Sequence, residues 1–353
     1  MIIGIHPDGT IHESYSEKWS GFLSQRGVEV QILNLLAPDA LEQVRNCDGV
    51  MWRWIHTPHF KQSAQRIMFT LEHYLGIPVF PNWQTVWHYD EKIAQRYLLD
   101  LLRAPTPRTW LFWDRDQALA WARVAPYPVV FKLSCGASSS NVLKVESKAE
   151  AIALINQSFD RGIFPSTMNE FRIPSGLPHT VKQARMLVRR VGDGLRYIWR
   201  GEYPRLPLFW WKPEYGYAYF QEFLPDNNYD TRITIIGNRA FGFRRLNRPN
   251  DFRASGSGNL VVDPEAIDRR CIEIAFQISR RGKFQSMAYD FLFKEGQPVI
   301  SEISYTFVDW TVHSCPGHWD SHLNWVEGQM WPEEVLVEDF LNEILHNKES
   351  QGS

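Results

Sequence analysis

Acidic and basic side chains alternate along the stretch from Tyr219 to Ser304, on segments that otherwise have the composition of strands. They form short groups, namely Asp230-Thr231-Arg232, Arg244-Arg245, Asp251-Phe252-Arg253, Asp290 and Glu302-Ile303-Ser304. A charge on the face of a sheet needs a partner or a ligand, because burying it alone is costly. An anionic ligand that carries a metal ion would satisfy both signs, so the stretch predicts a site for such a ligand.

Two of these carboxylates are expected to face one another across a hairpin. Its strands are predicted at Ser286–Phe293 and Pro298–Ser304, with a turn at residues 294–297. Asp290 and Glu302 would then lie opposite each other, and paired carboxylates suit a hard divalent cation. The alternative is a pair of solvated edge charges, which is weakened by the apolar residues that flank them: Met287, Phe291, Val299 and Ile303.

The segment around Lys132 is predicted to form a strand, a small-residue loop and a return strand. Lys132 lies in the apolar strand 128–133, and Ser138, Ser139 and Ser140 lie in the loop that follows. Small residues let backbone N–H groups approach phosphate oxygens closely, and serine hydroxyls add donors. The sequence has no Walker A or G-x-G-x-x-G motif, so a plain flexible hairpin is an equally good interpretation.

Residues 1–85 alternate strand-like and helical segments, an order that favours a small parallel sheet. Ligands of such sheets lie beyond the carboxyl ends of the strands. Asp8-Gly9 and Trp52-Arg53 fall at such ends, although ordinary loop residues are at least as good an interpretation. A helix is expected next at Tyr89–Leu102, with Lys92 in its first turn. A cation is mildly unfavourable there, and taken alone Lys92 is best interpreted as a surface lysine.

The region from about residue 160 to 217 contains a hairpin signal at Gly192-Asp193-Gly194, and aromatic and basic residues gather after that signal. Aromatic rings beside cations suit a sugar or another planar ligand. An aromatic loop packed on its own hairpin is the commoner arrangement, and a nucleic-acid platform would look similar. The net charge of −2 argues against nonspecific nucleic-acid binding.

The length of 353 residues predicts two or three packed units. Four cysteines lie far apart without a C-x-x-C pair, which indicates a reducing compartment rather than a disulfide framework. The N-terminus lacks the features of a signal peptide, and no apolar run approaches the roughly 20 residues that cross a bilayer. We therefore expect a cytoplasmic protein without a membrane span.

The segment from His313 to His322 contains residues that could bind zinc by type, namely Cys315, His318 and His322. Their spacing matches no standard structural site, and Pro316-Gly317 lies between them. A loop that borders the active site is therefore the preferred interpretation.

The order of these segments resembles the ATP-grasp ligases. The resemblance covers about residues 77–310 and rests on the lysine helix, the lysine-bearing flap, Gln221-Glu222-Phe223-Leu224, D-T-R, D-F-R and the D…E-x-S hairpin. It is strongest to the ligases that extend glutamate on ribosomal protein and to the glutathione synthetase group. The implied fold is α/β, with a Rossmann-like parallel-sheet unit at 1–85 before two ATP-grasp lobes at 86–217 and 218–347. The smaller lobe would carry the flap and the aromatic insertion, and the C-terminal lobe the metal and substrate site.

The same resemblance implies roles for the motif residues. Lys92 and Lys132 would hold the α- and β-phosphates of ATP, with Ser138, Ser139 and Ser140 in the flap over them. Glu222 and Leu224 of the Gln221–Leu224 hinge would present the adenine site, and Asp230 would contact the ribose. Asp290 and Glu302 would bind Mg²⁺, whereas Ser304 stands where the family usually has asparagine, a better ligand. Arg245 and Arg253 would contact the γ-phosphate or an acyl phosphate.

The implied function is an ATP-dependent ligase that joins a carboxylate to an amine through an acyl phosphate. The insertion favours a large polar substrate, such as a glycan-linked one, and dimers are common among relatives, so a homodimer fits the resemblance. A kinase or phosphotransferase on the same scaffold is the first alternative. A nucleotide-binding module without activity is the second, because Ser304 departs from the metal motif.

Overall fold

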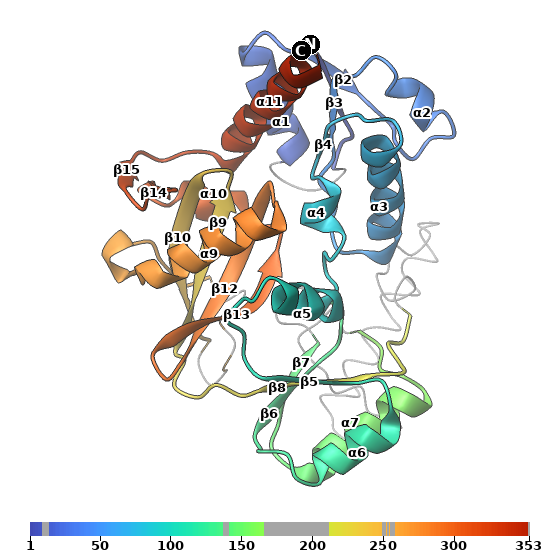
Figure 1. The fold of residues 1–353 in the computed structure, drawn as a ribbon, viewed down its shortest axis with the longest axis vertical. Coiled ribbons are helices and arrows are strands. Elements are labelled where there is room, and N and C mark those ends of the chain that lie inside the picture. The colour runs from blue at the N-terminus through green and yellow to red at the C-terminus, as the bar shows by residue number, and fades with distance from the viewer. Residues whose placement is uncertain are drawn as a thin grey trace, which may run out of the picture. The chain divides into compact units, whose positions relative to one another are not determined.

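The computed structural model describes residues 1–8, 14–136, 141–165, 212–248, 252, 254 and 258–351. The chain divides into two compact units (Figure 1). The first comprises residues 1–111 and 220–353, and the second comprises residues 112–219. Within the described residues, no helix is both long and apolar enough to span a bilayer.

A four-stranded parallel sheet begins the first unit, in the order β2-β1-β3-β4. Its strands are β1 (Ile2–Ile5), β2 (Glu29–Ile32), β3 (Gly49–Met51) and β4 (Val79–Phe80). The helices between them are α1 (Tyr15–Gln25), α2 (Ala40–Gln43) and α3 (Pro58–His73). The parallel sheet predicted from the alternating N-terminal segments is therefore confirmed.

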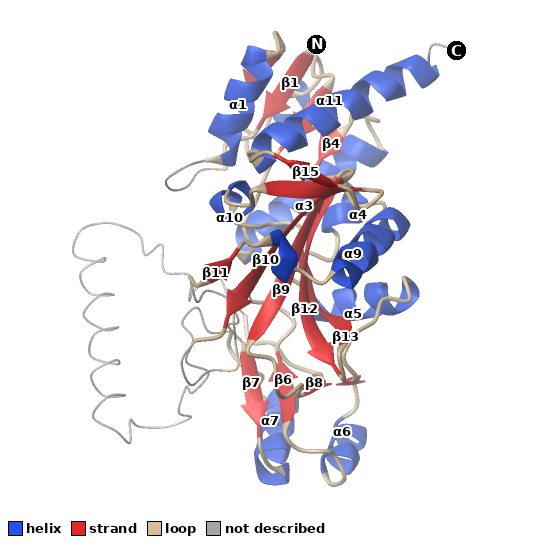
Figure 2. Cartoon of the chain, turned by 90° about the vertical axis from the view of Figure 1, so that its left-hand side faces the viewer, coloured by secondary structure: helices blue, strands red, loops and turns tan. Residues whose placement is uncertain are grey.

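The C-terminal helix α11 (Pro332–Gln351) returns to this sheet and packs beside α1 (Figure 2). Phe340 and Ile344 of α11 belong to one buried cluster with Trp19 of α1 and Ile3 of β1. A Cβ atom added at Gly49 would lie 2.6 Å from Ile344 Cδ1. Glycine therefore lets the last helix approach β3 closely.

A larger antiparallel sheet occupies the rest of the first unit, in the order β13-β12-β9-β10-β14-β15, with β11 paired to β10. Its strands are β9 (Tyr229–Ile236), β10 (Arg239–Leu246), β11 (Leu260–Val261), β12 (Ser286–Lys294), β13 (Gln297–Ser304), β14 (Gly317–Asp320) and β15 (Trp325–Glu327). The β12–β13 hairpin predicted from the sequence is confirmed, with a bulge after Asp290.

Helices cover this sheet and fix the hairpin. The amphipathic helix α9 (Arg269–Gly282) begins at an Asp268 cap and buries Ile272 and Phe276 in the same cluster as Ile233 and Tyr289 of the sheet. Helix α5 (Lys92–Leu101) lies against β13, where Gln95 Nε2 donates to the Ile303 carbonyl over 2.9 Å. Shorter elements are α4 (Trp83–Val86), the 3-10 turn η2 (Pro264–Ala266) and α10 (Asp309–His313).

The second unit contains β6 (Val129–Lys132), β7 (Val142–Val145), α6 (Arg115–Ala122) and α7 (Lys148–Asp160). The chain enters it through β5 (Thr109–Phe112) and leaves it through β8 (Ala218–Glu222), and the sheet order is β5-β8-β6-β7. Strands β6 and β7 pair antiparallel, with Lys132 opposite Val142. The two paired strands predicted around Lys132 are therefore confirmed, whereas residues 137–140 of the loop between them lie outside the described residues.

Candidate functional site

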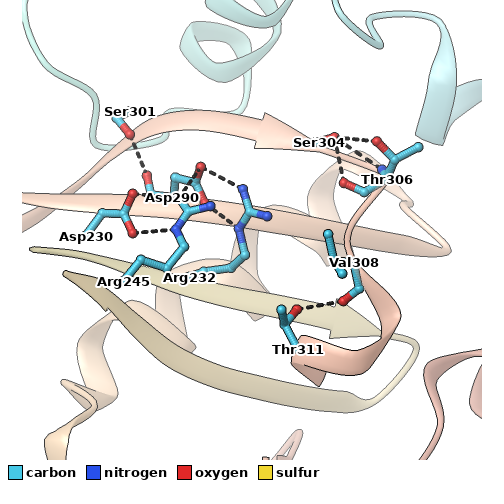
Figure 3. A network of polar contacts seen from close by, with 9 residues as sticks. All are labelled: Asp230, Arg232, Arg245, Asp290, Ser301, Ser304, Thr306, Val308 and Thr311. Carbon is cyan, nitrogen blue, oxygen red and sulfur yellow. Dashed lines mark hydrogen bonds and ion pairs between the residues drawn. The ribbon is translucent and has the colours of Figure 1, made fainter. Parts of the chain in front are cut away.

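Two aspartates and two arginines form a cluster on the antiparallel sheet (Figure 3). Asp230 and Arg232 are two residues apart on β9, so their side chains leave the same face. Arg245 on β10 is the register partner of Asp230, and Asp290 on β12 is the partner of Arg232. Strand pairing thus brings together charges from three separate segments of the sequence.

Each aspartate accepts a two-pronged contact from one arginine. Arg232 donates from Nε to Asp290 Oδ1 over 2.7 Å and from Nη2 to Asp290 Oδ2 over 2.8 Å. Arg245 donates in the same way to Asp230 over 2.7 and 2.6 Å, and its Nη2 lies 2.8 Å from Asp290 Oδ2. Both guanidiniums use Nε and Nη2 here. The Nη1 atom of each has no hydrogen bond to any described residue, so one edge of each fork remains available for an anion.

Electrostatics keep Asp290 ionised. Burial by itself would raise the pKa of its carboxyl, but Arg232 and Arg245 outweigh burial and hold that pKa well below its usual range. Burial likewise opposes the charge of Arg245, yet Asp290 and Asp230 raise the pKa of its guanidinium. Asp290 is therefore an anion at physiological pH.

Glu302 of β13 is the register partner of Asp290, so the two carboxylates lie on one face of the hairpin, as predicted. Its Oε1 atom lies 3.4 Å from Lys92 Nζ of α5, and its side chain is 37% exposed. Lys92 is only 5% exposed, so the interpretation of this residue as an ordinary surface lysine is wrong. Its helix packs against β13 and carries the ammonium group to the carboxylate.

The residues of the hairpin fit a magnesium ion. A carboxylate offers about four lone-pair sites. Asp290 uses two for hydrogen bonds from Arg232 and forms an ion pair with Arg245 Nη2 through Oδ2, so it keeps lone-pair capacity for a cation. Glu302 can offer its oxygens from a half-exposed position, and Mg²⁺ commonly takes one or two carboxylates with waters or phosphates completing the shell. Ser304 is a weaker candidate, because its hydroxyl donates to the Thr306 carbonyl over 2.9 Å.

The expected adenine hinge continues from β8. Glu222 accepts a hydrogen bond from the Arg108 backbone N–H over 2.7 Å, and its carboxylate pairs with Lys294 Nζ at 2.8 Å. Gln221 is buried, whereas Phe223 and Leu224 follow the strand and are partly buried. The Glu222 side chain is thus engaged with its neighbours, and what the hinge offers a base would come from its backbone. The role of Asp230 as a ribose contact stays a prediction, because both its oxygens face Arg245.

The structure does not test the remaining predicted site residues. Lys132 lies on β6 of the second unit and is 8% exposed. Ser138, Ser139, Ser140 and Arg253 fall outside the described residues. Their roles stay predictions.

The suggested zinc segment runs from α10 into β14. Cys315 is buried, and its thiol contacts the carbonyls of Gly242 and Thr311 at 3.6 Å. Among the described residues, no three histidine, cysteine or acidic side chains are grouped as a metal site. Cys315 is thus packed inside this part of the sheet.

One residue of the cluster, Arg232, was not assigned a role from the sequence. The signal was present in the D-T-R motif, because two charges at alternate positions of a strand share a face. What the sequence lacked was the identity of the neighbouring strand, which supplies Asp290 as the partner.

Comparison with known proteins gives related folds at low identity. No family model matches the sequence. The α-aminoadipate–LysW ligase LysX of Saccharolobus solfataricus is 23% identical over 219 residues, a match that spans 61% of this chain and 62% of that protein.

Solved structures match over nearly the whole chain. The RimK domain ATP-grasp protein of Sphaerobacter thermophilus has a TM-score of 0.54 at 14% identity, covering 97% of this chain and 100% of its own. D-alanine–D-alanine ligase of Bacillus anthracis, complexed with ATP, has a TM-score of 0.56 at 13% identity, and the match covers 98% of this chain and 99% of the ligase chain. The ligase PsnB, with minimal precursor, Mg and ADP, has a TM-score of 0.54 at 11% identity, covering 98% of each chain. The fold expected from the sequence is therefore confirmed.

Proposed function

We propose that this chain, which has the ATP-grasp fold, is an ATP-dependent ligase that joins a carboxylate to an amine. The fold alone does not fix an activity, so the proposal rests on the site. The observation that supports it most directly is that Asp290 and Glu302 lie opposite each other across the hairpin. Arg232, Arg245 and Lys92 lie beside them. This arrangement offers oxygens to a cation and cationic donors to phosphate on one sheet.

The charged groups suit phosphoryl transfer, in which the protein mainly positions the reactants and stabilises dispersed negative charge. Magnesium, when held by Asp290 and Glu302, would neutralise charge on the phosphates. Asp230 and Asp290 orient Arg245 and Arg232, so that their Nη1 edges are already fixed before an anion arrives. Such pre-orientation lowers the cost of binding the anion.

The reaction has two steps. An oxygen of the substrate carboxylate attacks the γ-phosphorus of ATP, and ADP leaves with the electrons of the broken P–O bond. The amine then attacks the acyl carbon of the acyl phosphate, phosphate leaves, and the new amide nitrogen loses a proton. We assign to Arg245 the stabilisation of the oxyanion in the second step, and to Arg253 and Lys132 contacts with the phosphoryl group.

The substrate classes follow from the relatives only in outline. LysX is named for α-aminoadipate and LysW, and PsnB has been solved with a precursor peptide. A small carboxylic acid with an amine, free or on a larger carrier, is the corresponding proposal here. A glycan-linked substrate and a homodimer remain expectations from the sequence.

A screen of acids and amines for ATP-dependent ADP release tests this proposal, with mass analysis of the product. Glu302→Gln should abolish most of the substrate-dependent release, whereas the control Glu327→Gln, an exposed carboxylate on β15, should not. Hydroxylamine should trap an acyl phosphate as a hydroxamate. A stable phosphorylated product formed without any amine would instead support the phosphotransferase alternative.

A further inference from the structure

Arg53 lies at the edge of the N-terminal parallel sheet that is formed by the carboxyl ends of its strands. It follows β3 by two residues, next to the end of β1, where His6 and Asp8 continue the chain. Parallel sheets bind ligands at this edge, beyond the carboxyl ends of their strands. The sequence left Arg53 as either a ligand-binding residue or an ordinary loop residue, and its surroundings now distinguish the two.

One tyrosine ring contacts the guanidinium, and two further tyrosines influence it electrostatically. Arg53 lies over the ring of Tyr15, 4.3 Å from its centroid, and Tyr305 and Tyr89 are further electrostatic neighbours. Burial raises the pKa of all three phenols above the usual value. The tyrosines are therefore neutral and cannot balance the positive charge.

Among the described residues, no acidic side chain is in contact with Arg53, although Asp8 is an electrostatic neighbour. None of the described residues forms a hydrogen bond or an ion pair with its guanidinium, in contrast to the two-pronged pairs of Arg232 and Arg245. The nearby Asp8 carboxylate accepts hydrogen bonds from the Ser14 and Ser16 hydroxyls and from the Tyr15 backbone N–H. A partly buried guanidinium with five donors in a planar fork is suited to an oxyanion.

Arg53 is tied to the end of the strand that carries Glu302. The Tyr305 hydroxyl donates to the Trp54 carbonyl over 2.8 Å and accepts from the Trp54 N–H over 3.1 Å, which fixes the residue next to Arg53. Tyr305 is three residues beyond Glu302, so at most about 11 Å of extended chain separates the two. A small substrate could therefore reach from Arg53 toward the reacting groups.

We propose that Arg53 binds an oxyanion of the substrate, so that the acid or the amine carries an anionic group in addition to the groups that react. This inference rests on the proposed ligase function for its setting. The favoured group is a second carboxylate, since Arg53 would then position one end of a dicarboxylate while the other end is activated. A phosphate would use the same fork.

Calorimetric titration of the nucleotide-free full chain tests the inference, with glutarate and inorganic phosphate as separate probes. At least one probe should bind the wild type saturably. Arg53→Gln should raise its dissociation constant at least about tenfold, because a hydrogen bond to a charged group is lost. Arg53→Lys keeps the charge without the planar fork, so its dissociation constant should lie between those of the wild type and Arg53→Gln. The control Arg45→Gln changes an exposed arginine paired with Glu42 and should leave binding unchanged.

The two probes identify the source of the oxyanion, because saturation by glutarate indicates a carboxylate and saturation by phosphate alone indicates a phosphorylated substrate. No saturable binding of either probe would overturn the inference, as would unchanged binding in a folded Arg53→Gln variant. If that variant does not fold, undiminished binding by Arg53→Lys would overturn it. If the protein forms amides with ATP but its anion binding does not depend on Arg53, only this inference is refuted. If Arg53 binds an anion but no amide forms with any substrate pair, only the ligase proposal is refuted.

Discussion

Replacing Asp290 by asparagine should destabilise the protein more than any exposed charge replacement. The change keeps the shape of the side chain but removes the anion that accepts two hydrogen bonds from Arg232 and forms an ion pair with Arg245. The buried guanidinium of Arg245 and the partly buried one of Arg232 would then share one remaining carboxylate, Asp230. Removing one partner of a buried ion pair typically costs about 3–5 kcal/mol, which is a large part of the roughly 5–15 kcal/mol that holds a domain folded.

Urea unfolding at neutral pH measures this loss, as a shift of the midpoint at constant slope. The matched control is Glu42→Gln, which breaks an exposed pair between side chains that are 62% and 69% exposed and should cost no more than about 1 kcal/mol. An Asp290→Asn variant no less stable than the Glu42→Gln variant would refute the view that the cluster is a buried network of ion pairs.

The same residue predicts an acid dependence. The pKa of Asp290 is lower in the folded chain than the value near 4 expected when unfolded. Its contribution to stability is therefore complete above about pH 4–5 and is lost as the pH falls. The wild type should lose stability toward acid more steeply than Asp290→Asn, and parallel curves for the two proteins would contradict this assignment.

Three further changes can be tested with the same protein. Glu302→Gln should lower substrate-dependent ADP release by about 10²–10³-fold, as for loss of one electrostatic contact to a transition state, in a steady-state assay. Burial raises the pKa of Glu333 to about 7, so the wild type loses stability as the pH rises from about 4.5 to 7 and this carboxyl must ionise in the folded chain. Glu333→Gln has no such loss. Its stability relative to the wild type, measured by thermal unfolding, should therefore increase between pH 5 and pH 8 by up to about 3 kcal/mol. Tyr305→Phe should lower the free energy of unfolding in urea by about 1–3 kcal/mol, because the Trp54 backbone loses its two hydrogen bonds to the hydroxyl. An unchanged midpoint would show that water replaces the hydroxyl.

Local patterns in the sequence sufficed to predict the hairpin that carries Asp290 and Glu302. Two apolar strands joined by a four-residue polar turn leave few registers, and the alternation of side chains fixed which residues share a face. The parallel N-terminal sheet was predictable for a similar reason, since strands alternating with helices favour parallel pairing.

The partners of the charged residues could not be predicted in this way. Arg245 and Asp230 meet because β9 and β10 form a hairpin, but Asp290 joins them only because β12 lies on the other side of β9. Sheet order depends on how the whole chain packs, and no short-range pattern encodes it. Lys92 was misjudged for the same reason, because its burial comes from the packing of α5 against β13.

The cluster itself argues for a role beyond stability. A buried ion pair is often no more stabilising than apolar side chains of the same volume, so stability alone gives no reason to keep four charges on this sheet. The charges instead orient the two arginines. Asp290 and Asp230 bind the Nε and Nη2 atoms of Arg232 and Arg245, which holds each Nη1 atom in a fixed position. An apolar cluster could offer nothing to an anion, and unpaired arginines would lose side-chain entropy when one bound. The aspartates are therefore best understood as residues that position the arginines, and the role of Asp290 as a cation ligand stays our proposal.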